Sequence, residues 1–300
     1  DRQHPHDLFS ELSLTYAHRV YRETSLFAYV AYPGEPAIGP VAFMHRPSAR
    51  YNPDSPLSHH WQDATHILFG VTTVGVANRW FKVEQSVFTG AEPDEERFGF
   101  DEPRFDSYAT RLSYSPTPTL TLQLSRAWLH APEALEPDVD QVRTTASALL
   151  SRSLGHGRDF SASLIWGAND ARADSAAADH HGSGIQHAVL AEAALTLRRT
   201  VIHGRLEYTR KSPGELGLDP HEIGDAPFDL VAFTLGAGQS VFRANGLAAM
   251  IGAQATAYAV PDRLTDLYGS RPVSLQIYLR IAPAPMQHDE TGERRGHQGH

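Results

Sequence analysis

Hydrophobic and polar residues alternate with a period of two along most of the chain, whereas the 3.6-residue period of a helix is nearly absent. In 119–128, for example, Leu120, Leu122 and Leu124 alternate with polar residues. This alternation predicts strands that each have one apolar face. The segments that show it are 8–20, 25–32, 66–78, 80–89, 106–115, 119–128, 142–153, 160–167, 187–198, 200–210, 228–240, 247–260 and 272–281.

The length of these thirteen predicted strands and of their connections points to a membrane. Strands of soluble sandwiches typically have about 5–6 residues, whereas a tilted membrane-spanning strand needs about 9–11. Short and long connections also alternate along the chain, and the long ones are rich in Pro, Gly, Asp and His. Short turns on one side and long loops on the other are typical of an outer-membrane β-barrel. The fold predicted is therefore an all-β, antiparallel transmembrane β-barrel.

Polar residues within the predicted strands are expected to face the interior of the barrel. In lipid every backbone N–H and C=O must be bonded within the protein, so strands span only as a closed barrel with an apolar outer face. Either the charged inner residues bond to one another, or they line a water-filled pore. The predicted lumen-lining residues are Glu11, Arg19, Lys82, Glu84, Arg111, Arg143, Arg205 and Glu207.

Two further features concern the interior. Glu192 lies in register with alanines and leucine, so either the alanine side of that strand faces the lumen or Glu192 marks a bulge. The longest loop, 33–65, contains the apolar residues Ile38, Val41 and Phe43. An apolar segment in an external loop is expected to fold inward rather than face water. Loop 33–65 is thus the predicted constriction.

The strand count predicts how the chain is divided. With short turns in the periplasm, the first strand runs inward from the outside, and a bacterial barrel normally has an even number of strands with both termini periplasmic. Thirteen strands then predict that residues 1–282 form the C-terminal part of a barrel of about 14–16 strands. In the alternative, one strand is misassigned and the barrel is complete at twelve or fourteen. The polar segment 283–300 is predicted to be a disordered tail.

Composition narrows the classes of function. The chain contains no cysteine, which excludes disulfides, thiolate metal sites and cysteine nucleophiles. The net charge of −9 argues against a nucleic-acid partner. The mean hydropathy of −0.36 resembles that of a soluble protein, but a barrel dilutes its apolar outer half with a polar lumen and polar loops.

Several segments resemble a known family. They are DRQHPHDLFSELSLTY (1–16), YPGEPAIGPVAFMHRPSA (32–49), SHHWQDATHILFGVTTVGV (58–76), GAEPDEERF (90–98), DSYATRLSYSPTP (106–118) and PEALEPDVDQVRTTAS (132–147). They are similar to an uncharacterised family of Gram-negative outer-membrane β-barrel proteins that are often found near metal-resistance genes. The resemblance covers residues 1 to about 170. It implies a location in the bacterial outer membrane, in contact with outer-membrane lipid and lipopolysaccharide, and it implies no activity.

Histidine is abundant, with seventeen residues, and several histidines gather near carboxylates in the N-terminal segment and loop 33–65. Imidazole and carboxylate ligands suit Cu(II), Zn(II) or Ni(II). The candidate metal ligands are His4, His6, Asp7, His45, His59, His60, Asp63 and His66. The alternative is that these are polar, hydrogen-bonded loop residues that plug or edge the mouth of the barrel. No cofactor is certain on this evidence; copper and zinc are the candidates.

Two acidic loops form a second constellation. Their carboxylates either concentrate cations at a channel mouth, bind Ca²⁺, or simply form a charged surface. The carboxylates are Glu92, Asp94, Glu95 and Glu96 in one loop, and Glu133, Glu136, Asp138 and Asp140 in the next.

The pattern as a whole predicts an outer-membrane barrel that acts as a channel or transport protein for small solutes, with metal ions among the candidate solutes. The alternative is a metal-binding surface protein that the barrel anchors. A third hypothesis is a hydrolase at the barrel rim, based on Ser58 with the histidines and aspartate near it. No specific hydrolase motif such as G-x-S-x-G accompanies these residues, so an enzyme is not expected.

Overall fold

The computed structural model describes residues 9–63, 68–93, 98–133, 137–173, 185–224, 226–244 and 246–283. It contains thirteen strands in one antiparallel sheet, in which each strand pairs with its neighbours in the sequence. The strands are β1 (Ser13–Tyr21), β2 (Thr24–Ala31), β3 (Val71–Ala77), β4 (Phe81–Phe88), β5 (Ser107–Thr117), β6 (Leu120–Leu129), β7 (Val139–Gly155), β8 (Arg158–Ala173), β9 (Gln186–Leu197), β10 (Thr200–Lys211), β11 (Phe228–Ala244), β12 (Leu247–Ala259) and β13 (Val273–Pro283).

The predicted all-β, antiparallel fold with thirteen strands is confirmed. Tight turns join β1 to β2, β3 to β4, β5 to β6, β7 to β8, β9 to β10 and β11 to β12, and the other six connections are long. Because neighbouring strands are antiparallel, all tight turns lie at one end of the sheet and all long loops at the other. β1 and β13 are the two edges of the sheet within the described residues.

Several strand boundaries differ from those predicted, among them the start of β1 and the ends of β7 and β8. β1 begins at Ser13 rather than Leu8, because its partner chain leaves it: Leu12 still bonds to Tyr32 and Pro33, but Gly34 pairs with Leu68 instead. β7 and β8 are longer than predicted, because Gly155, His156 and Gly157 all adopt positive φ and form a tight turn. The polar tail lies outside the described residues, except for Pro283.

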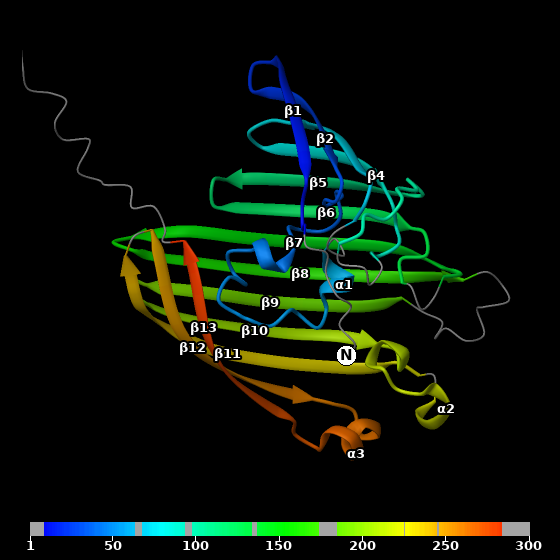
Figure 1. Ribbon diagram of the computed structural model, residues 1–300, viewed down its shortest axis with the longest axis vertical. Helices are drawn as coiled ribbons and strands as arrows, with labels where there is room; N and C mark the ends of the chain where they lie inside the picture. The colour runs from blue at the N-terminus through cyan, green and yellow to red at the C-terminus, as the bar shows by residue number, and fades with distance from the viewer. Residues whose placement is uncertain are drawn as a thin grey trace, which may run out of the picture.

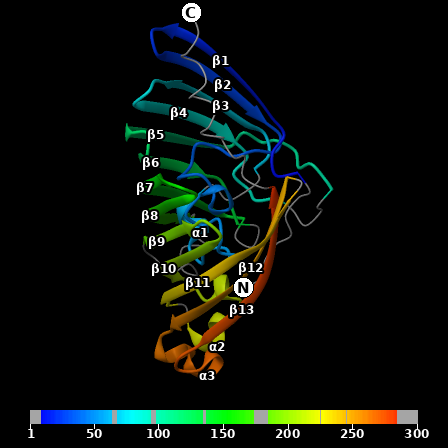
Figure 2. The same cartoon turned by 90° about the vertical axis from the view of Figure 1, so that its left-hand side faces the viewer.

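The sheet curls strongly, and the connection between β2 and β3 lies inside the curve (Figures 1 and 2). We call its described part, residues 33–63, the inserted segment. It contains the short helices η1 (Phe43–His45) and α1 (His59–Gln62). The remaining short helices lie in other long loops: η2 (Gly214–Leu216), α2 (Pro220–Ile223), η3 (Asp262–Leu264) and α3 (Thr265–Tyr268).

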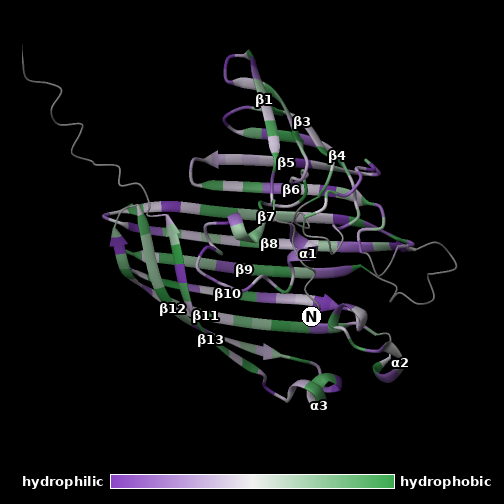
Figure 3. Cartoon of the chain, viewed as in Figure 1, coloured by the Kyte–Doolittle hydropathy of each residue, from purple (hydrophilic) through white to green (hydrophobic). Residues whose placement is uncertain are grey.

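Each strand shows two chemically different faces, as the alternating colours along the strands of Figure 3 show. The convex face exposes large apolar side chains at mid-strand, for example Val83, Leu124, Leu164, Leu206 and Phe233. The concave face carries alternate residues that are buried beneath the inserted segment. Its one apolar cluster in the described residues joins Ile38 of the inserted segment to Ala31, Leu68, Val71, Phe88, Ala109, Ala127 and Leu129.

No helix in the described part of the chain combines the length and the hydrophobicity needed to cross a lipid bilayer.

Candidate functional site

The inserted segment is attached to the concave face of the sheet first at β4, β5 and β6. The backbone N–H of Ala37 donates to Ser86 Oγ (2.8 Å), and that of Gly39 donates to Ser125 Oγ (2.8 Å). Arg111 Nη1 donates to the carbonyl oxygen of Gly39 (3.1 Å). Hydroxyl and guanidinium groups of the sheet thus satisfy the backbone of a chain that has no strand partner there.

A buried ion-pair network lies at the centre of the inserted segment. Arg46 Nε donates to Glu192 Oε1 (2.8 Å), and Arg46 Nη1 donates to Asp63 Oδ2 (3.2 Å). Ser48 Oγ donates to the same Glu192 oxygen (2.9 Å). Burial raises the pKa of Asp63 to about 6, although the charge of Arg46 opposes this shift. Glu192 therefore faces the interior, and the alternative in which the alanine side of β9 is the inner face is the one that holds.

The far side of the segment is attached to β10, β12 and β13. Arg205 Nη1 donates to the carbonyl oxygen of Asp54 (2.9 Å), and Gln254 Nε2 donates to Asp54 Oδ2 (2.7 Å). Tyr278 Oη donates to the carbonyl oxygen of Tyr51 (2.9 Å). The inserted segment therefore contacts the concave face of the sheet from β4 to β13.

The segment then returns toward β8 through α1. Asn169 Nδ2 donates to the carbonyl oxygen of His60 (3.2 Å), and Trp61 is almost fully buried. Gly167 allows this approach, because a Cβ added there would lie 1.9 Å from the carbonyl oxygen of Trp61. Glycine is thus required on the inner face where the backbone of α1 touches the sheet.

The inserted segment is held mainly by polar contacts, although its apolar residues were the reason to expect it inside. Ile38 is fully buried, but Val41 and Met44 are 46% and 49% exposed. By contrast, Arg46, Ser48 and Asp63 are each buried to 95% or more, with 1%, 3% and 0% exposed. The apolar pattern indicated the correct location of the loop, but hydrogen bonds and ion pairs fix it there.

Most residues predicted to line the lumen form ion pairs on the concave side. Glu84 accepts hydrogen bonds from Arg111 Nε (2.7 Å) and pairs with Lys82 Nζ (2.7 Å). Arg205 Nε lies 2.8 Å from Glu207 Oε1. The Glu84–Arg111 pair joins neighbouring strands, whereas the Lys82–Glu84 and Arg205–Glu207 pairs each lie on one strand, and all of them neutralise charge inside the curve.

Arg143 is fully buried, and it reaches both the sheet and the segment. Its Nε donates to Asn169 Oδ1 (3.0 Å), and its Nη1 donates to the carbonyl oxygen of Asp63 (3.1 Å).

Glu11 lies outside β1, where it accepts a hydrogen bond from Ser13 Oγ (2.6 Å). Glu11 is thus at the edge of the sheet rather than beneath the inserted segment.

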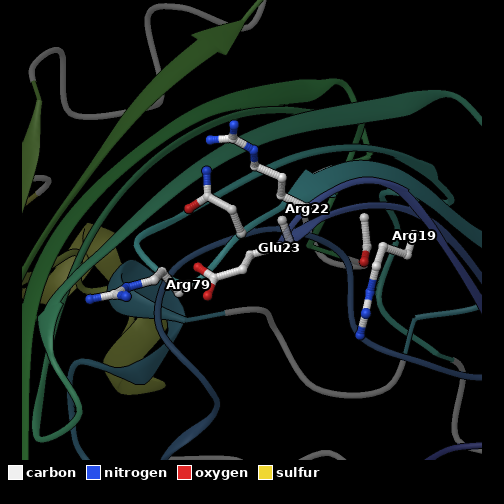
Figure 4. Close-up of a pocket in the computed structure, with 7 residues that line it drawn as sticks. Arg19, Arg22, Glu23 and Arg79 are labelled. Atoms are coloured by element: carbon white, nitrogen blue, oxygen red, sulfur yellow. The ribbon is translucent and has the colours of Figure 1, made fainter.

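Arg19 is exposed near the tight turn after β1. It lines a shallow pocket of about 600 Å³ together with Arg22, Glu23 and Arg79 (Figure 4). The arginine side chains in this pocket point in different directions, and Arg79 stacks on the ring of Trp80, with its guanidinium carbon 4.1 Å from the ring centroid. The pocket lies at the tight-turn end of the sheet and is open to solvent.

The predicted metal ligands of the inserted segment have different neighbours in the structure. His45 Nε2 lies 3.8 Å from Glu35 Oε1, and Asp63 is paired with Arg46. The ring of His59 lies 4.1 Å, centroid to centroid, from that of His60. The remaining predicted ligands lie outside the described residues: His4, His6, Asp7 and His66.

His60 instead meets one carboxylate from each of the two acidic loops. Its Nδ1 lies 3.6 Å from Glu92 Oε1 and 3.7 Å from Glu133 Oε1. One donor atom from each of the three residues lies within 4.8 Å of the others. Three residues from two separately predicted constellations therefore form one cluster. Asp94, Glu95, Glu96 and Glu136 lie outside the described residues.

Electrostatics in this cluster favour protonation. Burial, followed by the nearby charge of Glu133, raises the pKa of Glu92 to about 7. Burial alone would lower the pKa of His60, but the hydrogen bond to Glu133 and the charges of both glutamates outweigh it and raise that pKa. Two carboxylates and an imidazole are thus held together at the long-loop end of the sheet.

The residues considered for a rim hydrolase have other contacts. Ser58 is fully buried. Its hydroxyl donates to Gln62 Oε1 (3.0 Å), with a longer contact to Glu207 Oε2 (3.4 Å). Asp63 is engaged by arginines rather than by a histidine. The arrangement of Ser58 offers no activated nucleophile to solvent.

No protein-family model matches the chain, and no curated protein matches it in sequence. Among solved structures, the chain is similar to a porin refined at 1.8 Å resolution, with 14% identity, a TM-score of 0.42, and coverage of 91% of this chain and 92% of that chain. It is also similar to a variant of OccD1 (OprD), with 9% identity, a TM-score of 0.40, and coverage of 86% and 84%. A third similar structure is Pseudomonas aeruginosa OpdL, with 12% identity, a TM-score of 0.38, and coverage of 90% and 76%.

With identities of 14% or less and TM-scores of 0.42 or less, these similarities carry no inference about the family or function of the chain. Its predicted membership of an outer-membrane family near metal-resistance genes stays a prediction.

Proposed function

We propose that the chain is an outer-membrane β-barrel protein that conducts small polar solutes past the inserted segment. The observation that carries this proposal is the contrast between the two faces of one curled sheet. The convex face is apolar and exposed, and the concave face is polar and lies against a chain segment. A barrel with lipid outside and water inside requires such an apolar outer face and polar inner face.

The convex face supports the membrane part of the proposal. Its mid-strand apolar side chains are strongly exposed even on strands that are paired on both sides, for example 57% at Leu164 of β8. Aromatic residues with polar tips lie nearer to the strand ends, with Tyr21 and Trp80 on the tight-turn side and Tyr108 and Tyr208 on the long-loop side. Such aromatic girdles are typical of the two membrane interfaces of a barrel. Outer-membrane lipid and lipopolysaccharide are the partners proposed for this face.

The inserted segment supports the channel part. A loop fixed across the interior narrows a barrel that would otherwise be wide at this number of strands. Charged pairs such as Glu84 with Arg111 lie on the concave face, beside the proposed path of the solute. Such groups suit polar or charged solutes rather than apolar ones.

Conductance measurements in planar bilayers test this function. Because the chain contains no cysteine, a thiol reagent reacts only with the one cysteine that is introduced. The protein with Met44→Cys carries one thiol on the inserted segment, at a side chain that is 49% exposed. Its control, Val83→Cys, carries one thiol on the convex face, at a side chain that is 47% exposed. After reconstitution into planar bilayers, a charged methanethiosulfonate reagent is expected to reduce the single-channel conductance of Met44→Cys and to leave that of Val83→Cys unchanged.

Two results would contradict the proposal. If the unmodified protein carries no ion current at any applied voltage, it is not a channel. If modification at Met44 leaves the current unchanged, the inserted segment does not narrow the path.

A second candidate function, metal binding by a barrel-anchored protein, is favoured by the His60, Glu92 and Glu133 cluster.

A further inference from the structure

We infer that His60, Glu92 and Glu133 form a divalent-cation site of the zinc type, which ties the inserted segment to two long loops of the sheet. The site differs from the predicted set of histidines, of which it includes only His60. It does not depend on the channel function, since a cation could bind here whether or not solutes pass.

The donor atoms are suitable in kind. The cluster presents one imidazole nitrogen and two carboxylate oxygens, a donor set that Zn²⁺ accepts. Ca²⁺ and Mg²⁺ prefer oxygen ligands alone. Three protein ligands leave a fourth position of a tetrahedral ion for water, as in many zinc sites that are open to solvent.

The distances are also suitable. Two ligands bound to a tetrahedral zinc ion at about 2.0–2.1 Å lie about 3.4 Å apart. His60 Nδ1 lies 3.6 Å from the Glu92 oxygen and 3.7 Å from the Glu133 oxygen. All three donor atoms lie within 4.8 Å of one another, so shifts of about an ångström or less would bring both carboxylates into coordination. The side chains of His60, Glu92 and Glu133 are 21%, 8% and 34% exposed, so an ion can enter from solvent.

The backbone holds the three ligands in place before any ion binds. The backbone N–H of Glu92 donates to the carbonyl oxygen of Pro132 (3.0 Å), which joins the β4–β5 loop to the β6–β7 loop just before Glu133. On the other side, Asn169 fixes the backbone of His60 within α1. Ligands that are positioned in advance lose less conformational entropy on binding.

Two nearby cations lower the expected affinity. The buried guanidinium of Arg143 acts on both His60 and Glu92, and the charge of Lys211 acts on Glu133. Arg143 also donates to Asn169 and to the carbonyl oxygen of Asp63. We therefore expect binding weaker than that of a structural zinc site with four protein ligands.

Isothermal titration calorimetry with ZnCl₂ on the full chain in detergent tests the site. Other histidines can bind zinc, so the comparison between variants decides. His60→Gln, Glu92→Gln and Glu133→Gln are each expected to weaken one zinc-binding event about tenfold or more. The matched controls are His18→Gln and Glu102→Gln, which alter an exposed histidine and an exposed glutamate outside the cluster and are expected to bind as the unmodified protein does. Circular dichroism checks that each variant keeps its strands.

Three outcomes would overturn the inference. These are a zinc isotherm unaffected by either glutamate variant, equal losses in the control pair, and tighter binding of Ca²⁺ than of Zn²⁺ at these residues. Because the titration needs no membrane and no current, its failure is distinguishable from failure of the proposed channel.

Discussion

The convex and concave faces of the sheet are built from residues that alternate along the same strands, yet they have opposite chemistry. On β10, Arg205 and Glu207 are buried and paired on the concave face, whereas Leu206 between them is 50% exposed on the convex face. Burial alone would place leucine inside and charges outside. The inversion fits the proposed surroundings of the two faces, with lipid outside the sheet and a polar interior within.

The two faces are also expected to contribute to the stability of the protein in different ways. The concave face depends on specific partners, because a buried charge without its partner is costly. The convex face depends only on hydrophobicity, because lipid makes no directional contact. Three pairs of substitutions test this difference, from the largest expected effect to the smallest.

The first concerns an inner and an outer arginine. Arg46→Ala leaves Glu192 and Asp63 buried without their cation, and it is expected to lower the free energy of unfolding by about 3–5 kcal/mol. The control Arg126→Ala removes an exposed arginine from β6 and is expected to change it by about 0.5 kcal/mol or less. Urea titration in lipid vesicles, followed by tryptophan fluorescence, measures both. Similar losses in the two variants would contradict the assigned role of the inner network.

The second concerns depth on the convex face of β10. Leu206→Arg places a charge at mid-strand and is expected to cost about 2–4 kcal/mol in a bilayer, whereas Ile202→Arg, near the strand end, is expected to cost about 1 kcal/mol or less. The same urea titration compares the two. If both arginines cost the same, the convex face is not in contact with a bilayer of the expected depth.

The third concerns a glycine on each face. Gly167→Ala forces a methyl group against the backbone of Trp61 and is expected to cost about 1–3 kcal/mol. At Gly204 on the convex face, a Cβ would lie 3.3 Å from the nearest atom, the carbonyl oxygen of Thr234. Gly204→Ala is therefore expected to change stability by about 1 kcal/mol or less. A tolerated Gly167→Ala, measured as above, would mean that α1 is not pressed against the sheet.

Much of the fold could be predicted from the sequence because alternation is a local property. The residues on each strand face follow from the period of two, and the regular change between short and long connections fixes which strand ends meet. The start of β1 was predicted wrongly, since the alternating pattern continues past the point at which the partner chain turns away to pair with Leu68 at Gly34.

The candidate site was predictable only in part. Loop 33–65 was expected inside, and Glu92, Glu133 and His60 were each singled out, but in separate groups. Their meeting depends on where α1 lies across the sheet, and no local pattern encodes that position. The same applies to Arg46, whose partner Glu192 is 146 residues away along the chain.

The sequence by itself thus determined the thirteen strands, their two faces and the side on which the long loops lie, because each follows from period-two patterning and chain connectivity. Only the tertiary structure decided which charges pair, that polar contacts hold the inserted segment in place, and that His60 meets Glu92 and Glu133. These contacts join residues far apart in the chain, and they form only because the curl of the sheet brings its concave face around one loop.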